Sequence, residues 1–100
     1  MGRKKNEIRE RDIEKYLRDE IRKAGGRAYK FVSPGNNGVP DRICLFPGGR
    51  IVFVELKAPG KKTTALQAAQ IAKIRALGFK VYIIDSKAGV DALLEEVITK

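Results

Sequence analysis

Three charged residues sit at one end of two apolar segments, where a charge is costly. Asp41 directly precedes the apolar run of residues 42–46, and Glu55 and Lys57 lie at the end of the run of residues 51–57. Side chains alternate between the faces of a strand, so Glu55 and Lys57 share a face. A charge beside a core is stable only when it is paired or bound to a metal. These three residues are therefore the first candidates for chemistry.

The residue types that are absent restrict this chemistry. The chain has no histidine and one cysteine, which excludes serine–histidine triads, histidine-ligated zinc and an internal disulfide. Cys44 lies between Ile43 and Leu45, so we expect a buried thiol and not a nucleophile. Any catalysis must use carboxylates, lysine and a bound metal.

Asp41, Glu55 and the backbone carbonyl of Leu56 are hard oxygen ligands of the kind that Mg²⁺ prefers while it keeps several waters. Such a metal lowers the pKa of a bound water and stabilises charge on a phosphoryl oxygen. Lys57 could position the attacking water or stabilise the transition state. The set predicts hydrolysis of a phosphodiester with Mg²⁺, for which Mn²⁺ would substitute.

The register of the expected hairpin decides whether Asp41 joins the other two residues. A two-residue turn at Gly48-Gly49 places Asp41 opposite Leu56, on the wrong face. A three-residue loop or a bulge shifts the pairing by one and brings Asp41 beside Glu55 or Lys57. We adopt the shifted register as a hypothesis; carboxylates on opposite faces would refute it.

Two helices are expected to supply further groups. The first spans about residues 7–24, with Glu10 inside its apolar stripe and Glu14 at the edge. An acid there either suits the helix dipole or points at something buried, such as a second metal or a metal-bound water. In the helix expected at residues 65–77, Gln67 could hydrogen-bond substrate or orient Lys57.

The whole chain reads as one α/β domain, residues 1–100, in the order α-β-β-β-α-β-α. Strands are expected at residues 27–33, 42–46, 51–57 and 80–85, and a last helix after Ser86. The unit from 51 to 85 should be a right-handed parallel crossover, which gives a mixed sheet flanked by helices. We expect the strand at 80–85 to be buried on both faces. The inner face of the helix at 65–77 should include Leu66, Ile74 and Leu77.

The charge of the chain indicates its partner. The 21 lysines and arginines exceed the 12 acids, so the net charge is +9, and nucleic acid is the first candidate polyanion. Each basic residue could equally be an ordinary solvated charge; those that could contact phosphates are Arg3, Lys4, Lys5, Lys61 and Lys62. No apolar stretch approaches the ~20 residues of a membrane span, and no secretory signal is present.

Pro40-Asp41 followed by Glu55-Leu56-Lys57 matches the PD-(D/E)XK nuclease pattern. More closely, the chain resembles the virus-type replication-repair nucleases (VRR-NUC), in their small stand-alone phage or bacterial form. The blocks that carry the resemblance are Glu10-Arg-Asp-Ile-Glu14, Phe31-Val-Ser-Pro-Gly35, Gly38-Val-Pro-Asp41, Phe53-Val-Glu55-Leu-Lys57, Leu66-Gln67 and Val81-Tyr82-Ile83.

This resemblance implies a PD-(D/E)XK fold and divalent-metal-dependent cleavage of DNA. Asp41 and Glu55 would be metal ligands, Lys57 the catalytic lysine and Gln67 an accessory glutamine. The family pattern points to Glu10 as a further acid at the metal, and Glu14, one turn on, could substitute. It also implies a homodimer that cuts branched DNA such as four-way (Holliday) junctions, in the cytoplasm of a bacterial or phage-infected cell.

Two other functions remain open at this point. The first is a basic module that holds DNA or RNA without cutting it, with Asp41 and Glu55 as structural charges. The intact acid–acid–lysine set argues against it, because a pure binder gains nothing from acids near phosphate. The second is a sequence-specific restriction-type nuclease, for which the sequence offers no separate base-reading element.

Overall fold

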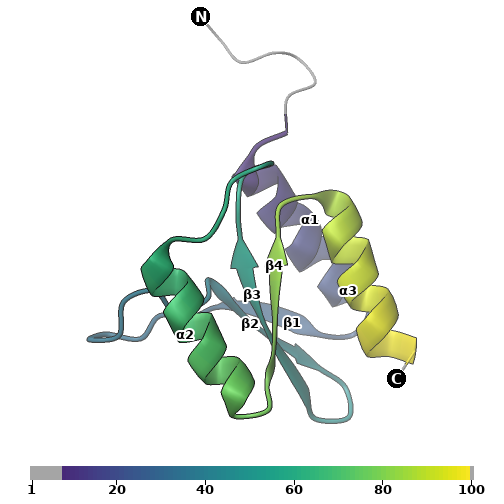
Figure 1. The fold of residues 1–100 in the computed structure, drawn as a ribbon. Coiled ribbons are helices and arrows are strands. Elements are labelled where there is room, and N and C mark those ends of the chain that lie inside the picture. Colours follow the sequence, from purple (N-terminus) through teal and green to yellow (C-terminus); the bar gives the residue numbers. More distant parts are fainter. Residues whose placement is uncertain (1–7, 100) are drawn as a thin grey trace, which may run out of the picture.

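The computed structural model describes residues 8–99, and its elements follow the expected order (Figure 1). The elements are α1 (Glu10–Lys23), β1 (Arg27–Lys30), β2 (Arg42–Phe46), β3 (Arg50–Leu56), α2 (Ala65–Ala76), β4 (Lys80–Ile84) and α3 (Lys87–Thr99). No helix among these residues is long and apolar enough to cross a membrane.

The described strands form one mixed sheet in the order β1-β2-β3-β4. β1, β2 and β3 are joined by antiparallel pairing, and β4 runs parallel to β3 after the crossover through α2. The strand order corrects one expectation, because β4 is an edge strand. Its Ile83 side chain is 45% exposed, so the strand is not buried on both faces.

α1 and α3 pack together on one face of the sheet, and α2 lies on the other (Figure 1). Even-numbered side chains of β3 point to the first face, where Val52, Val54 and Leu56 are buried with Ile13 and Leu93 in the main core. Odd-numbered side chains therefore point to the α2 face. Glu55 and Lys57 belong to this second face.

The inner face of α2 differs from the prediction. Leu66 and Leu77 are 52% and 76% exposed, whereas Ile71 is the buried residue of the helix. Ile74, the third residue predicted for this face, is half-buried one turn after Ile71, and alanines occupy much of the rest of the helix. The helix therefore contacts the sheet along a narrow line through Ile71.

Element ends explain the remaining differences. β1 ends at Lys30 and not at residue 33, although the Phe31 N–H still donates to the Asp41 carbonyl at 2.8 Å. Beyond that bond the chain turns away at the Pro34-Gly35 segment. The other elements begin or end within about three residues of the prediction. Ser86 caps α3 as expected, because its Oγ accepts the Gly89 N–H at 3.0 Å.

Candidate active site

The hairpin has the shifted register. Phe46 pairs with Arg50 and Arg42 with Val54, so residues 47–49 form a three-residue loop and the next pair is Asp41 with Glu55. Gly48 and Gly49 both have positive φ angles, 85° and 77°, which glycine adopts without strain. The hypothesis that placed Asp41 beside Glu55 is confirmed. We call this end of the sheet, with Asp41, Glu55 and Lys57, the carboxylate end.

Asp41 is fixed by the backbone of the neighbouring strand. Its Oδ2 accepts the Leu56 N–H at 2.8 Å. A residue in a strand directs its N–H and its C=O to the same side, so the Leu56 carbonyl also points toward Asp41. One carboxylate oxygen and one backbone carbonyl therefore converge from β2 and β3 on the same place.

Glu55 is the unusual group of the site. Its side chain is 1% exposed, and its Oε1 has no hydrogen-bond partner within residues 8–99. Burial and the nearby charge of Asp41 raise the pKa of Glu55 to about 7, although Lys57 opposes the shift. A buried carboxylate oxygen without a partner lowers the stability of the fold by on the order of 1–3 kcal/mol. This oxygen is therefore a candidate ligand for a bound cation.

Lys57 lies between this carboxylate and α2. Its Nζ donates to Gln67 Oε1 at 2.7 Å and is 3.4 Å from Glu55 Oε2. Gln67 Oε1 also accepts the Thr64 N–H at 2.9 Å, while Thr64 Oγ1 accepts the Gln67 N–H. Gln67 therefore closes a capping box at the start of α2 and orients Lys57 with the same oxygen.

The donor set fits a divalent metal. Glu55 Oε1, the second oxygen of Asp41 and the Leu56 carbonyl are hard ligands, and Mg²⁺ completes its shell with water. Within residues 8–99 no three carboxylate, histidine or cysteine side chains gather closely enough to hold a metal ion. A metal here would thus be held by two carboxylates, one carbonyl and water.

The two candidate acids of α1 have different surroundings. Glu10 is exposed, and its charge contributes to the raised pKa of Glu55, so it faces the carboxylate end. The Glu14 carboxylate instead lies 2.7 Å from Arg42 and 2.6 Å from Arg18. Glu10 is therefore placed toward the site and Glu14 is held by two arginines.

Other sequence candidates are placed as follows. Cys44 is fully buried, and burial raises the pKa of its thiol to about 12, so it is no nucleophile. Lys61 and Lys62 are exposed on the loop between β3 and α2. The basic residues Arg3, Lys4 and Lys5 lie outside the described residues. The contact between Gln67 and Lys57 was expected from the sequence, but the capping box that Gln67 forms with Thr64 was not, although the Thr64-x-x-Gln67 spacing signals it.

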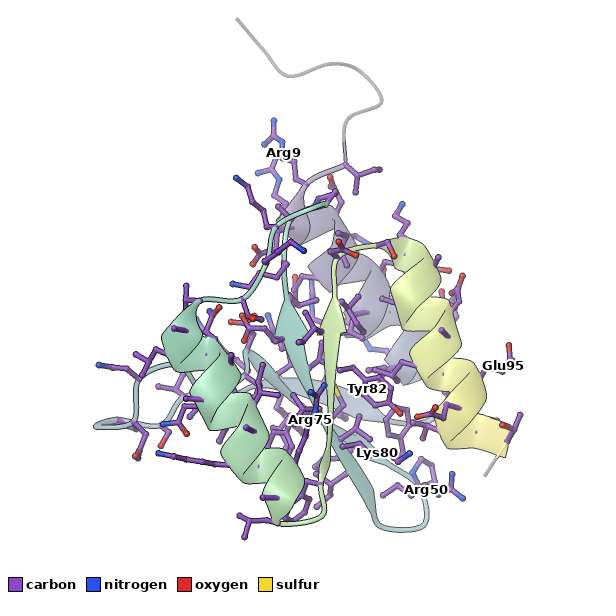
Figure 2. All side chains as sticks on the ribbon, viewed as in Figure 1. Arg9, Arg50, Arg75, Lys80, Tyr82 and Glu95 are labelled. Carbon is purple, nitrogen blue, oxygen red and sulfur yellow. The ribbon has the colours of Figure 1, made fainter. Side chains whose placement is uncertain are left out.

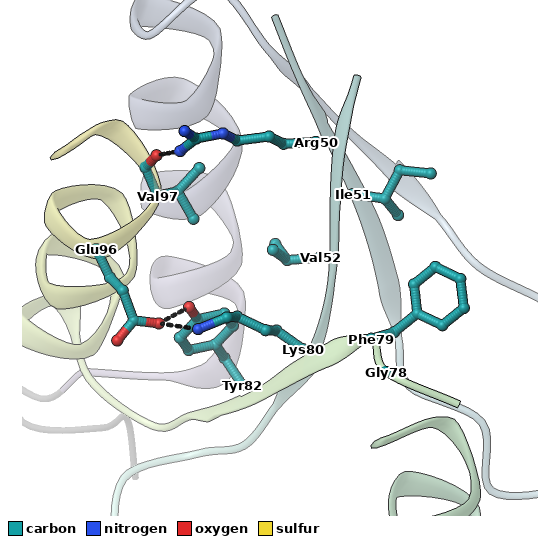
Figure 3. Close-up of a pocket in the computed structure, with 9 residues that line it drawn as sticks. All are labelled: Arg50, Ile51, Val52, Gly78, Phe79, Lys80, Tyr82, Glu96 and Val97. Atoms are coloured by element: carbon teal, nitrogen blue, oxygen red, sulfur yellow. Dashed lines mark hydrogen bonds and ion pairs between the residues drawn. The ribbon is translucent and has the colours of Figure 1, made fainter. Parts of the chain in front are cut away.

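A hollow of about 290 Å³ lies at the opposite end of the sheet, between the starts of β3 and β4 and the last turns of α3 (Figure 3). The polar side chains that line it have hydrogen-bond or ion-pair partners within the protein. Glu96 accepts from the Tyr82 hydroxyl and from Lys80, and Arg50 donates to the Val97 carbonyl. We call this region, where Figure 2 labels Arg50, Lys80 and Tyr82, the paired end.

Comparisons with known proteins show which family the chain resembles. No family model matches the sequence. The chain is 56% identical over 80 residues to "Putative nuclease p44" of Acyrthosiphon pisum secondary endosymbiont phage 1, a match that covers 80% of this chain and 86% of that protein. A solved structure described as a VRR_NUC domain superposes with a TM-score of 0.81 and 31% identity, covering 86% of this chain and 94% of that one.

Fold and site together define a PD-(D/E)XK-like α/β nuclease domain, with a four-stranded mixed sheet and three helices. The chain belongs to the VRR_NUC family. The resemblance seen in the sequence is thereby confirmed, and so is the predicted fold.

Proposed function

We propose that the protein is a divalent-metal-dependent DNA endonuclease that hydrolyses phosphodiester bonds at the carboxylate end. One observation carries the proposal, namely the buried and unpartnered Glu55 Oε1 beside Asp41 and Lys57. A non-cleaving binding module has no use for a carboxylate that destabilises its own fold. Membership in the VRR_NUC family supports the same function.

In this proposal Asp41, Glu55 and the Leu56 carbonyl hold Mg²⁺, or Mn²⁺ in its place. The bound metal would lower the pKa of a water and neutralise charge on the scissile phosphate. Water adds to phosphorus, the bond to one sugar oxygen breaks, and the proton of the water ends on that leaving oxygen. The products are a phosphate monoester and a hydroxyl group.

The lysine and the glutamine have separate tasks. The Lys57 ammonium stabilises the negative charge that develops on the phosphoryl oxygens or positions the attacking water. Gln67 holds the ammonium at 2.7 Å and so fixes its direction. Glu10, at the exposed start of α1, would act through a metal-bound water or a second metal, because it does not complete a three-carboxylate cluster.

We further propose branched DNA, such as a four-way junction, as the substrate and a homodimer as the active form. A domain of 100 residues covers little duplex, whereas a two-fold pair presents two sites to two strands of a near-symmetric junction. The net charge of +9 suits a large phosphate surface. The relative from a phage supports action in the cytoplasm of an infected bacterial cell.

The test is a cleavage assay on linear duplex, flap and four-way-junction DNA, with Mg²⁺, with Mn²⁺ and with a chelator. Asp41→Ala and Lys57→Ala are assayed alongside the wild type. We expect metal-dependent cuts in the branched substrates that both substitutions abolish.

Three other results would contradict parts of this proposal. Binding without metal-dependent cleavage would identify a binding module. Equal activity in wild type and both variants would reveal a contaminating nuclease. Cleavage confined to one sequence in linear duplex would identify a restriction-type enzyme.

A further inference from the structure

Glu14 is clamped by two arginines that come from different elements. Its Oε2 lies 2.6 Å from Arg18 Nε and 2.7 Å from Arg42 Nη2. Arg18 stands one turn further along α1, so that contact is internal to the helix. Arg42 is the first residue of β2, so the second contact joins α1 to the sheet. Both side chains of this joining pair are mostly buried, at 18% and 19% exposure.

The two residues of the joining pair neighbour two groups of the proposed site along the chain, although the Arg42 side chain lies on the α1 face of the sheet and Asp41 on the α2 face. Arg42 directly follows Asp41 in the chain. Glu14 lies one helical turn after Glu10, and residues four apart share a helix face. Ile13, fully buried between the two acids, anchors the same turn in the core. The Glu14–Arg42 contact thus fixes the first turns of α1 relative to the start of β2.

We propose that Glu14 is a positioning residue, which holds Arg42 and thereby sets the placement of Asp41 and Glu10 for metal binding. This inference rests on the proposed function of the carboxylate end. Removal of the Glu14 charge frees the start of β2 from α1, so that Asp41 and Glu10 are no longer held in a fixed arrangement. The loss of this fixed arrangement weakens the binding of a divalent cation.

The alternative is that Glu14 only stabilises the fold, as a mostly buried ion pair does. Arg18 offers a matched control, because it binds the same carboxylate oxygen but from within α1. Arg18→Gln removes the other ion pair of Glu14 Oε2 and leaves the contact between Glu14 and Arg42 in place. A purely structural role predicts similar behaviour of Glu14→Gln and Arg18→Gln.

The experiment measures Mn²⁺ binding by calorimetry at pH 8, without DNA and well below the unfolding temperature of every variant. We expect Glu14→Gln and Arg42→Gln each to weaken Mn²⁺ binding by at least about tenfold, as loss of an outer-shell partner does. The double variant should be no weaker than either single one, because the two residues act as one unit. Arg18→Gln should bind Mn²⁺ as the wild type does. Arg42→Lys serves if Arg42→Gln does not fold.

Asp41→Ala separates the failure of this inference from the failure of the proposed function. If Asp41→Ala abolishes Mn²⁺ binding while Glu14→Gln and Arg42→Gln leave it unchanged, Glu14 is only a stabilising residue. Additive losses in the double variant would overturn the inference in the same way. If Asp41→Ala keeps wild-type Mn²⁺ binding, the metal site itself is misplaced and the proposed function fails with it.

Discussion

The two ends of the β3–β4 pair carry similar residues but treat charge in opposite ways. The paired end has the hollow, and its Glu96 is met by a tyrosine hydroxyl and a lysine. The carboxylate end buries Glu55 more deeply, yet leaves one of its oxygens without a partner among the described residues. A lysine accompanies the acid at both ends.

This difference shows that a cavity alone does not locate the chemistry. A satisfied acid at a hollow stabilises the fold, whereas an unsatisfied buried acid costs stability and indicates a missing ligand. The carboxylate end also lies where parallel strands end, the common place for ligands in α/β sheets. Substitutions matched between the two ends can test this distinction.

The lysines give the largest expected contrast. Lys57→Met should reduce DNA cleavage by about 10²–10³-fold, the usual cost of removing one group that stabilises transition-state charge. Lys80→Met, at the paired end, should leave cleavage within about twofold, because Lys80 is 59% exposed and pairs with Glu96 at the surface, away from the proposed site. Single-turnover rates on one junction substrate measure both, and an equal loss in both variants would erase the distinction between the ends.

Glu55→Gln should stabilise the metal-free protein above pH 7. The folded state holds the Glu55 proton with a pKa of about 7 against the usual 4.5, so wild-type stability falls as pH rises through this window. At about 1.4 kcal/mol for each tenfold change in proton affinity, the gain from Gln is at most about 3.5 kcal/mol. Urea unfolding with chelator at pH 5 and pH 8 measures it.

The same substitution should abolish stabilisation by Mn²⁺ and cleavage. Glu96→Gln is the matched control at the paired end, and it should destabilise the protein at pH 8, because it removes the charge that Lys80 and Tyr82 contact. If Glu55→Gln were destabilising at pH 8, the interpretation of Oε1 as an unsatisfied atom would be wrong.

Tyr82→Phe should cost about 1 kcal/mol of unfolding free energy and leave cleavage by the folded protein unchanged. The Tyr82 hydroxyl donates to Glu96, and burial together with that carboxylate raises the pKa of Tyr82. Thermal unfolding and the cleavage rate are compared for the same preparation. A loss of activity without a loss of stability would connect the paired end to catalysis.

The smallest effect concerns the exposed lysines of the loop before α2. Lys61→Gln with Lys62→Gln should weaken metal-free DNA binding a few-fold at ~0.1 M salt and lower the salt slope by at most about 2, since each phosphate contact contributes about 0.9. Lys73→Gln with Lys80→Gln, toward the paired end, is the control. Equal slopes for both double variants would mean that the loop before α2 does not guide the DNA.

The sequence was sufficient for the element order but left two hairpin registers open. The structure has the three-residue loop at residues 47–49 that the adopted hypothesis required. The edge position of β4 and the narrow contact of α2 were not predictable, because they depend on how distant elements pack together. An apolar strand has the same sequence pattern in the middle of a sheet and at its edge.

The sequence named the residues of the candidate site but not its energetics. Spacing grouped Glu55 with Lys57, whereas Asp41 joined them only through the hairpin register adopted as a hypothesis. The choice between Glu10 and Glu14 required the structure, because both project from one side of α1 and only packing brings Arg42 to Glu14. The burial of Glu55 is likewise a tertiary property, which no local pattern reports.

One oxygen of Gln67 connects the candidate catalytic lysine to the end of a helix. It accepts both the Lys57 ammonium and the Thr64 amide, so Lys57 keeps its direction only while the first turn of α2 is closed. Helix ends open more readily than their centres. The exchange of the Thr64 amide hydrogen with solvent therefore reports how often Lys57 is released, and bound metal or DNA should slow that exchange.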